Sequence, residues 1–252
     1  MNRTSISDLK AKAKDQLLGN YGIATGSFAL LFVLMYSIMS IVISAFATGF
    51  YGNDPTVIDT SLARQLGVQF VGILIGSVCV TFSVGYIYML RRITKGERPE
   101  LRDMFFAFRN HPDKVIILSL ILSGIQFILL IPANIIGIGS NNGVIDGKRF
   151  LLFVVLYLAG LIISLVIDLM LAMCFLIYID DPQMSVAEIV KGSVNMMRGN
   201  KFRYFYLGLT FIGYWLLAIL SLFVAALWIA PYQTMTMIDF YLDIREDYEN
   251  GI

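Results

Sequence analysis

Long apolar runs alternate with short charged segments along this chain. Residues 21–50 contain no charged side chain, and further apolar runs occupy residues 68–90, 115–138 and 151–178. A helix needs about 20 mainly apolar residues to cross the hydrocarbon core of a bilayer, so each run predicts one membrane-spanning helix. The pattern therefore predicts an all-α membrane protein.

The last apolar run, residues 205–244, is too long for one pass. As a single helix it would extend about 60 Å, roughly twice the thickness of the hydrocarbon core. We expect two passes with a turn at residues 220–226, which leaves Pro231 inside the final helix. The prediction is therefore six transmembrane helices arranged as three hairpins.

A short amphipathic segment on the cytoplasmic side precedes each predicted hairpin. The three segments are residues 5–18, 99–108 and 185–198. A Gly-Asn pair directly follows both the first and the third segment. Internal repeats are common in membrane proteins. We therefore predict a single membrane domain, residues 1–252, built from repeat units at roughly residues 5–90, 99–178 and 185–249.

The first of these segments shows the helical pattern most clearly. Leu9 and Leu17 fall on one face of a helix that Ser5 or Ser7 can cap, and Gly19 can end it in the left-handed conformation. We favour a helix whose apolar face lies in the headgroup layer of the inner leaflet. The alternative is a charged flank that only orients the first span.

Positive charge is distributed unevenly between the predicted loops. Of the 19 Lys and Arg residues, only Arg64, Lys148 and Arg149 fall in loops that lie outside when the N-terminus lies inside. Cytoplasmic loops of membrane proteins carry an excess of Lys and Arg. The sequence thus predicts a multi-pass membrane protein with both termini in the cytoplasm.

Composition argues against several functional classes. The formal net charge of +1 gives no basic field for nucleic acid. His111 is the single histidine, and Cys79 and Cys174 both lie inside apolar runs, so neither a metal site of His or Cys ligands nor a Ser-His-Asp triad in the membrane is expected. We find no phosphate-binding or hydrolase motif. We expect no catalytic residue, no metal and no cofactor, which favours a non-enzymatic protein.

Asp168 is the most informative polar residue of the chain. A carboxylate within a span is costly and by default indicates a functional site. Two roles are open. Asp168 can pair near the inner interface with an arginine such as Arg91, Arg92 or Arg203, or it can bind a proton or a cation.

Three residues of the third predicted span could join Asp168 in a candidate intramembrane polar site: Gln126, Pro132 and Asn134. Pro132 should kink its helix, which can free backbone carbonyl groups near Asn134. Polar residues in spans more often hydrogen-bond between helices than bind substrates. Transport of a small solute or an ion is therefore the alternative function.

The first functional hypothesis is binding of lipid or of an envelope partner at the inner leaflet. Basic side chains near the membrane surface attract anionic lipid by about 1 kcal/mol each. The candidates are Lys10, Lys12, Lys14, Arg102, Arg198, Lys201 and Arg203. The expected partners are membrane lipids and either another envelope protein or a second copy of the chain, with no nucleic acid.

Residues that suggest a family lie mainly in the C-terminal third. They are Asp181-Pro182, Ser185, Glu188, Ser193, Met197, Gly199, Phe211-Ile212-Gly213, Trp215-Leu216-Leu217, Leu227-Trp228, Pro231-Tyr232 and Phe240-Tyr241. Through them the chain resembles the bacterial integral membrane proteins catalogued as domain of unknown function nine-seven-five. That family is distantly similar to the membrane domain of some glycerophosphodiester phosphodiesterases. The resemblance implies a bacterial plasma-membrane protein and carries over no activity.

Overall fold

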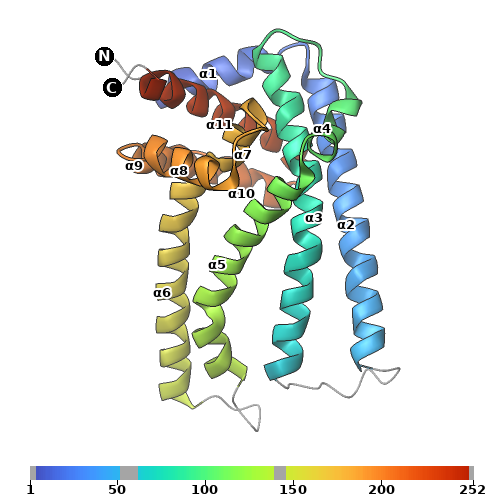
Figure 1. Cartoon of the computed structure of the whole chain (residues 1–252), viewed down its shortest axis with the longest axis vertical. Coiled ribbons are helices and arrows are strands. Elements are labelled where there is room, and N and C mark those ends of the chain that lie inside the picture. The colour runs from blue at the N-terminus through green and yellow to red at the C-terminus, as the bar shows by residue number, and fades with distance from the viewer. Residues whose placement is uncertain (1–3, 52–61, 139–145, 250–252) are drawn as a thin grey trace. The chain divides into compact units, whose positions relative to one another are not determined.

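The computed structural model describes residues 4–51, 62–138 and 146–249. Figure 1 shows these residues as helices joined by short connections, and no β-strand occurs among them. The prediction of an all-α protein is confirmed.

The chain divides into two compact units. Unit 1 comprises Met1–Leu34, Val80–Val115 and Leu169–Ile252, and unit 2 comprises Met35–Cys79 and Ile116–Asp168. Four long helices contribute residues to both units: α2 (Tyr21–Tyr51), α3 (Leu62–Thr94), α5 (Pro112–Ile138) and α6 (Gly147–Leu171).

Unit 1 also contains the other helices of the described residues. They are α1 (Ile6–Leu17), the 3₁₀ helix η1 (Leu101–Phe105), α4 (Phe106–Arg109), α7 (Cys174–Asp180), α8 (Val186–Met196), α9 (Lys201–Leu209), α10 (Ile212–Leu220) and α11 (Ala226–Glu249). The main packing contacts in this unit join α1 to α11 and α7 to α8. The first and last helices of the chain thus lie against each other (Figure 1).

Helix α1 has the capped ends that its sequence predicts. The Ser5 side chain accepts a hydrogen bond from the backbone N–H of Asp8, and Gly19 follows the helix with a φ of +84°. However, Leu9, Ala13 and Leu17 are almost completely buried, and α11 is the helix that packs on α1. The expectation that this apolar face enters the lipid headgroups is wrong, because protein covers it.

Each of the three predicted amphipathic segments begins in a similar way in the structure. Ser185 and Glu188 form a reciprocal capping box at the start of α8, and Glu100 and Asp103 form one at η1. Ser5 and Asp8 share two hydrogen bonds at α1. A capping residue followed three positions later by an acidic residue satisfies backbone N–H groups at a helix start. This shared local geometry is what a repeat would produce, and the three repeat units stay a prediction.

Five segments of the described residues are long and apolar enough to cross a membrane. They are Tyr21–Ser44, Leu66–Thr94, Pro112–Gly137, Gly147–Asp180 and Lys201–Leu220. Helix α11 is not one of them, because charged side chains occupy its second half from Asp239 onward. Its apolar first half alone would extend about 20 Å, less than the hydrocarbon thickness. The chain is therefore consistent with a multi-pass membrane protein.

The turn expected at residues 220–226 is confirmed. Helix α10 ends at Leu220 and α11 begins at Ala226, with Pro231 inside α11. Two residues of the turn, Leu222 and Phe223, have φ angles of +52° and +65°. Bulky residues adopt this left-handed conformation at a cost of roughly 1–2 kcal/mol each. The turn is built from these residues without glycine or proline, so the sequence contains no turn residue that marks it.

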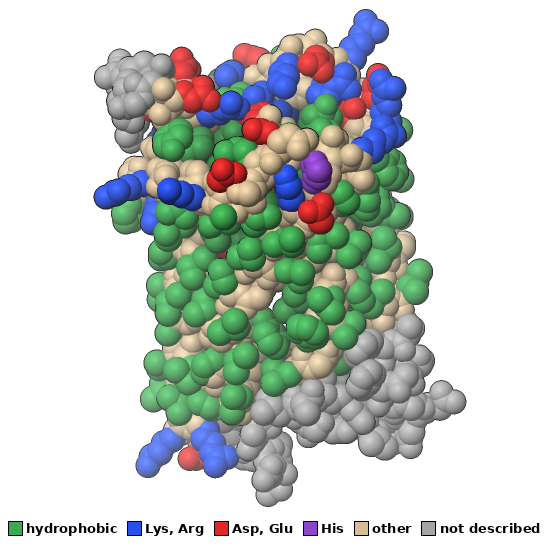
Figure 2. Space-filling view, in the orientation of Figure 1, with side chains coloured by type: hydrophobic (Ala, Val, Ile, Leu, Met, Phe, Trp, Pro, Cys, Tyr) green, Lys and Arg blue, Asp and Glu red, His purple; other side chains and the backbone are tan. Residues whose placement is uncertain are grey.

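Helices α5 and α6 pack closely within unit 2. A Cβ atom on Gly160 of α6 would lie 3.1 Å from the carbonyl oxygen of Leu129, so the glycine permits the close approach. Hydrophobic side chains cover most of the visible face of unit 2, whereas charged side chains are concentrated on the elements of unit 1 (Figure 2). Exposed apolar surface of this extent favours contact with lipid.

Candidate functional site

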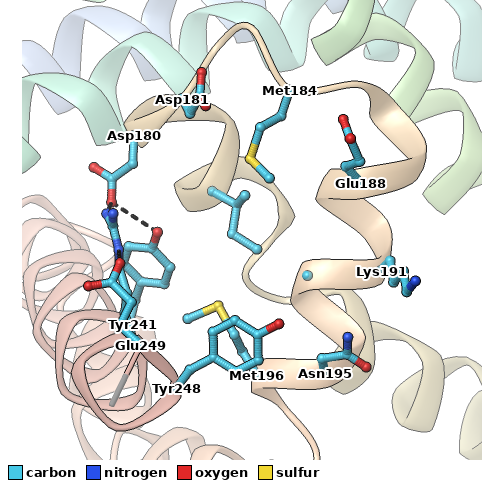
Figure 3. A pocket seen from close by; sticks show the side chains of 13 residues that line it. Asp180, Asp181, Met184, Glu188, Lys191, Asn195, Met196, Tyr241, Tyr248 and Glu249 are labelled. Carbon is cyan, nitrogen blue, oxygen red and sulfur yellow. Dashed lines mark hydrogen bonds and ion pairs between the residues drawn. The ribbon is translucent and has the colours of Figure 1, made fainter. Parts of the chain in front are cut away.

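A groove on the surface of unit 1 lies between α7, the segment that follows it, α8 and α11. Its volume is about 340 Å³, and we call it the α7–α11 groove. Figure 3 shows the side chains that line it: Ile177, Asp180, Asp181, Met184, Glu188, Lys191, Gly192, Asn195, Met196, Tyr241, Arg245, Tyr248 and Glu249. Pockets of 300–1,000 Å³ are typical of sites that bind small ligands or parts of larger ones.

Asp180 is the most highly connected side chain of the groove. The Tyr241 hydroxyl donates to its Oδ2 atom at 2.9 Å, and Arg245 binds the same oxygen. Arg91 of α3 approaches its Oδ1 atom at 3.3 Å. Burial, followed by the charge of Asp180, raises the pKa of the Tyr241 phenol above its ordinary value, so this hydroxyl stays a donor. The network fixes the end of α7 against α3 and α11.

Two further ion pairs connect α11 with the N-terminal residues and α9. Asp239 is completely buried and lies 3.1 Å from the Lys12 ammonium, with Gln16 donating to it at 3.2 Å. Asp243 accepts from the Thr4 hydroxyl and pairs with Arg203 at 2.6 Å. Burial raises the pKa of the Asp239 carboxyl, although Lys12 acts in the opposite direction.

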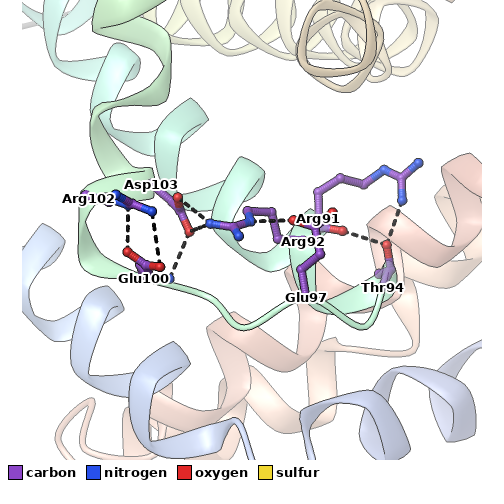
Figure 4. Close-up of polar contacts among 7 residues, drawn as sticks. All are labelled: Arg91, Arg92, Thr94, Glu97, Glu100, Arg102 and Asp103. Atoms are coloured by element: carbon purple, nitrogen blue, oxygen red, sulfur yellow. Dashed lines mark hydrogen bonds and ion pairs between the residues drawn. The ribbon is translucent and has the colours of Figure 1, made fainter.

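A separate polar cluster joins the end of α3 to η1 (Figure 4). Arg92 binds both carboxylate oxygens of Asp103 at 2.7 and 2.8 Å, and it also pairs with Glu97 at 2.7 Å. Arg102 pairs with Glu100 at 2.6 Å on the exposed side. These contacts shape the connection between α3 and η1.

Four of the seven candidate lipid-contact residues have partners inside the protein. Lys12, Arg102 and Arg203 pair with the carboxylates named above. The Lys10 ammonium donates to Thr210 at 2.9 Å and lies 4.3 Å from the centre of the Phe211 ring, and partial burial lowers its pKa. Lys10, Lys12 and Arg203 make contacts between helices, whereas Arg102 pairs with its neighbour Glu100. The charges of these four side chains are therefore less available to lipid than the sequence suggests.

The side chains of the other three candidates have no hydrogen-bond or ion-pair partner among the described residues. These candidates are Lys14, Arg198 and Lys201. Lys14 and Arg198 are exposed, and Lys201 is half-buried at the start of α9. The next residue, Phe202, is 88% exposed. An exposed aromatic ring beside cationic side chains is typical of a segment at the membrane interface.

The structure brings Gln126 and Asp168 together in unit 2. The Gln126 side-chain N–H₂ donates to both carboxylate oxygens of Asp168, at 3.1 and 3.0 Å. Asn134 is near Gln69 of α3, at 3.5 Å, and Pro132 lies within α5 as expected. The candidate intramembrane polar site therefore consists of two separate pairs rather than one cluster.

The expected pairing of Asp168 with an arginine is not the arrangement found in the described part of the chain. Arg91 approaches Asp180, Arg92 binds Asp103, and Arg203 binds Asp243. Gln126 donates to Asp168 instead. The physical reason is that these arginines and their acidic partners all belong to the closely packed elements of unit 1, whereas Asp168 lies on α6 within unit 2.

The α7–α11 groove was not predicted from the sequence. Its lining residues span 72 positions, from Ile177 to Glu249, and no motif joins them. Asp181, Glu188 and Tyr241 are among the residues that suggested the family, which is the one signal in the sequence that pointed to this region. No group of acidic, His or Cys side chains suited to a metal ion occurs among the described residues.

Five segments of the described residues are long and apolar enough to cross a membrane, which is consistent with the class of helical multi-pass membrane proteins. The chain belongs to the family described as Protein of unknown function (DUF975), whose model matches residues 1–248. No curated protein and no solved structure matches the chain. The distant similarity to glycerophosphodiester phosphodiesterases therefore stays a prediction.

Proposed function

We propose that the protein is a non-enzymatic membrane protein of the bacterial plasma membrane whose unit 1 binds anionic lipid at the inner leaflet. The observation that carries the proposal is the segment at the α8–α9 junction. There Arg198 and Lys201 have no partner among the described residues, and Phe202 is exposed. A ring inserted at headgroup level with two cations beside it would bind anionic lipid by hydrophobic burial and by charge attraction.

The proposal includes an even number of spans with both termini in the cytoplasm. Helix α1 packs on α11, and Lys12 pairs with Asp239, so the two terminal helices lie on the same side of any membrane. An even number of passes satisfies this arrangement. The excess of Lys and Arg in the predicted inside loops supports the cytoplasm as that side.

The test compares two variants that remove the same charge from segments on opposite sides of the membrane in the proposed topology. We expect Arg198→Gln with Lys201→Gln to lower the anionic share of co-purified lipid by about half. Lys148→Gln with Arg149→Gln, at the start of α6, which the proposal places outside, should leave that share unchanged. Each protein is extracted in polymer nanodiscs without detergent, and its lipids are quantified by mass spectrometry. Equal lipid composition for the two variants would contradict the proposal.

Transport is the second candidate function, and the Gln126–Asp168 pair is the observation that favours it. The carboxylate lies in an apolar helix and receives hydrogen bonds from a neutral amide rather than from a cation. A charged carboxylate in such a place is costly, and binding a proton or a cation would remove the cost.

Asp168→Asn should leave the unfolding temperature unchanged or raise it, because asparagine keeps an acceptor for Gln126 and carries no charge. Ser164→Ala, one turn earlier on α6, serves as the control for a polar change in the same helix. Unfolding is followed in detergent, and proton flux is followed in liposomes that contain a pH-sensitive dye. Transport is supported if wild type conducts protons and Asp168→Asn does not. Absence of flux in the wild type excludes a proton pathway.

A further inference from the structure

We propose that the α7–α11 groove binds a short basic and apolar peptide segment of a partner protein. The segment carries one bulky apolar side chain flanked by Lys or Arg. Such sequences occur where a membrane span meets its cytoplasmic flank, because those flanks are rich in Lys and Arg. The location of the groove on the cytoplasmic side rests on the topology proposed above, whereas the chemistry of the groove does not.

The edge of the groove has an excess of negative charge. Its lining contains four carboxylates, those of Asp180, Asp181, Glu188 and Glu249, and the two cations Lys191 and Arg245. Asp180 pairs with Arg91 and Arg245, and Glu249 pairs with Arg245, so two cations largely compensate these two carboxylates within the protein. Two carboxylates, those of Asp181 and Glu188, therefore matter most for a ligand.

Neither of these two carboxylates has an ion-pair partner among the described residues. Asp181 accepts from the backbone N–H of Gln183 at 2.9 Å. Glu188 accepts from the N–H and the hydroxyl of Ser185, and these hydrogen bonds lower the pKa of its carboxyl. Both side chains are exposed. They are placed to attract a cation at the edge of the groove.

The floor of the groove is apolar and adaptable. Ile177, Met184 and Met196 form it, and Gly192 leaves room where any other residue would place a side chain. Methionine side chains are flexible and polarizable, which suits them to bind apolar groups of different shape. Tyr248, which is 49% exposed, stands at one edge and offers an aromatic face to a cation.

The form of the groove favours a peptide segment over a small enclosed ligand. Figure 3 shows the acidic side chains of α8 and its preceding loop across the groove from Tyr248 and Glu249 of α11. A bulky apolar side chain fits between these two walls, and its basic neighbours then lie near Asp181 and Glu188. Apolar anchoring supplies affinity, while charge complementarity selects the partner.

The experiment measures binding of a fluorescent probe peptide, acetyl-Lys-Leu-Phe-Lys-Arg-amide, by anisotropy. The full-length protein is held in nanodiscs of phosphatidylcholine alone, which removes attraction of the peptide to anionic lipid. Asp181→Asn with Glu188→Gln should weaken binding about tenfold. Both substitutions keep the acceptors that cap the local backbone, so the fold is preserved. Gly192→Leu, which fills the floor, should weaken binding by a similar factor.

The matched control is Glu246→Gln with Asp247→Asn, which removes two charges from α11 outside the groove lining. It should bind the probe as the wild type does. Equal binding of a probe in which alanine replaces leucine and phenylalanine would overturn the proposal, since it would show attraction by charge alone. Equal weakening by the control variant would also overturn it. Because no anionic lipid is present, failure of this test leaves the lipid proposal to its own experiment.

Discussion

Replacing Gly85 with alanine should prevent the protein from folding stably. Gly85 lies on α3 where η1 crosses it, and both elements belong to unit 1. A Cβ atom at this position would lie 1.9 Å from the carbonyl oxygen of Met104 and 2.8 Å from its Cα atom. All of the clashing atoms are backbone, so no side-chain rotation can relieve the overlap. We expect destabilisation of about 3 kcal/mol or more.

The measurement is the yield of monodisperse protein by size-exclusion chromatography and its unfolding temperature in detergent. Gly76→Ala is the control, because Gly76 is on the same helix and no atom lies within 4 Å of the added Cβ. Alanine is favoured over glycine in a helix by roughly 0.5–1 kcal/mol, so this variant should be as stable as the wild type or more so. Equal stability of the two variants would show that η1 does not pack on α3 in this way.

Local signals in the sequence were sufficient to predict the ends of several helices. Ser185 and Glu188 have the spacing of a capping box, and the structure has that box at the start of α8. Gly19 has the left-handed conformation expected after α1. The turn before α11 was located by comparing the length of the last apolar run with the thickness of the membrane. Each of these features depends on a few neighbouring residues or on one length, so a single sequence contains the information.

The partner of an apolar face could not be predicted in the same way. The periodicity of Leu9 and Leu17 shows that one face of α1 is buried, but lipid and protein are equally apolar. The structure places α11 there, more than 200 residues away along the chain. The partners of Lys10 and Lys12 could not be predicted either. Thr210 and Asp239 lie on segments that only the fold brings close to these lysines.

The candidate site depends on the same kind of long-range contact. Asp168 was recognised from its place in an apolar run, yet its partner Gln126 is 42 positions away and is neutral. An arginine partner for Asp168 would require that the arginines nearest to it in the predicted topology have no other carboxylate partner. In unit 1 those arginines already have carboxylate partners, and one of these ion-pair groups surrounds Asp180.

Asp180→Asn should destabilise the folded protein by about 3 kcal/mol. The side chains of Asp180 and Arg91 are only 9% and 10% exposed, and Arg245 binds the same carboxylate. Removing the negative charge leaves two cations facing a neutral amide in a poorly hydrated place, and breaking a buried pair typically costs 3–5 kcal/mol. Tyr241 would also lose its charged acceptor.

Glu249→Gln is the matched control, since it removes a carboxylate from the same arginine at an exposed position. The Glu249 side chain is 60% exposed, and surface ion pairs contribute at most about 1 kcal/mol. Unfolding temperatures in detergent should therefore fall clearly for Asp180→Asn and hardly at all for Glu249→Gln. Adding Arg245→Gln to Asp180→Asn should recover part of the loss, because one unpaired cation is removed with it. A double variant less stable than Asp180→Asn alone would show that Arg245 stabilises α11 through Glu249 and packing rather than through Asp180.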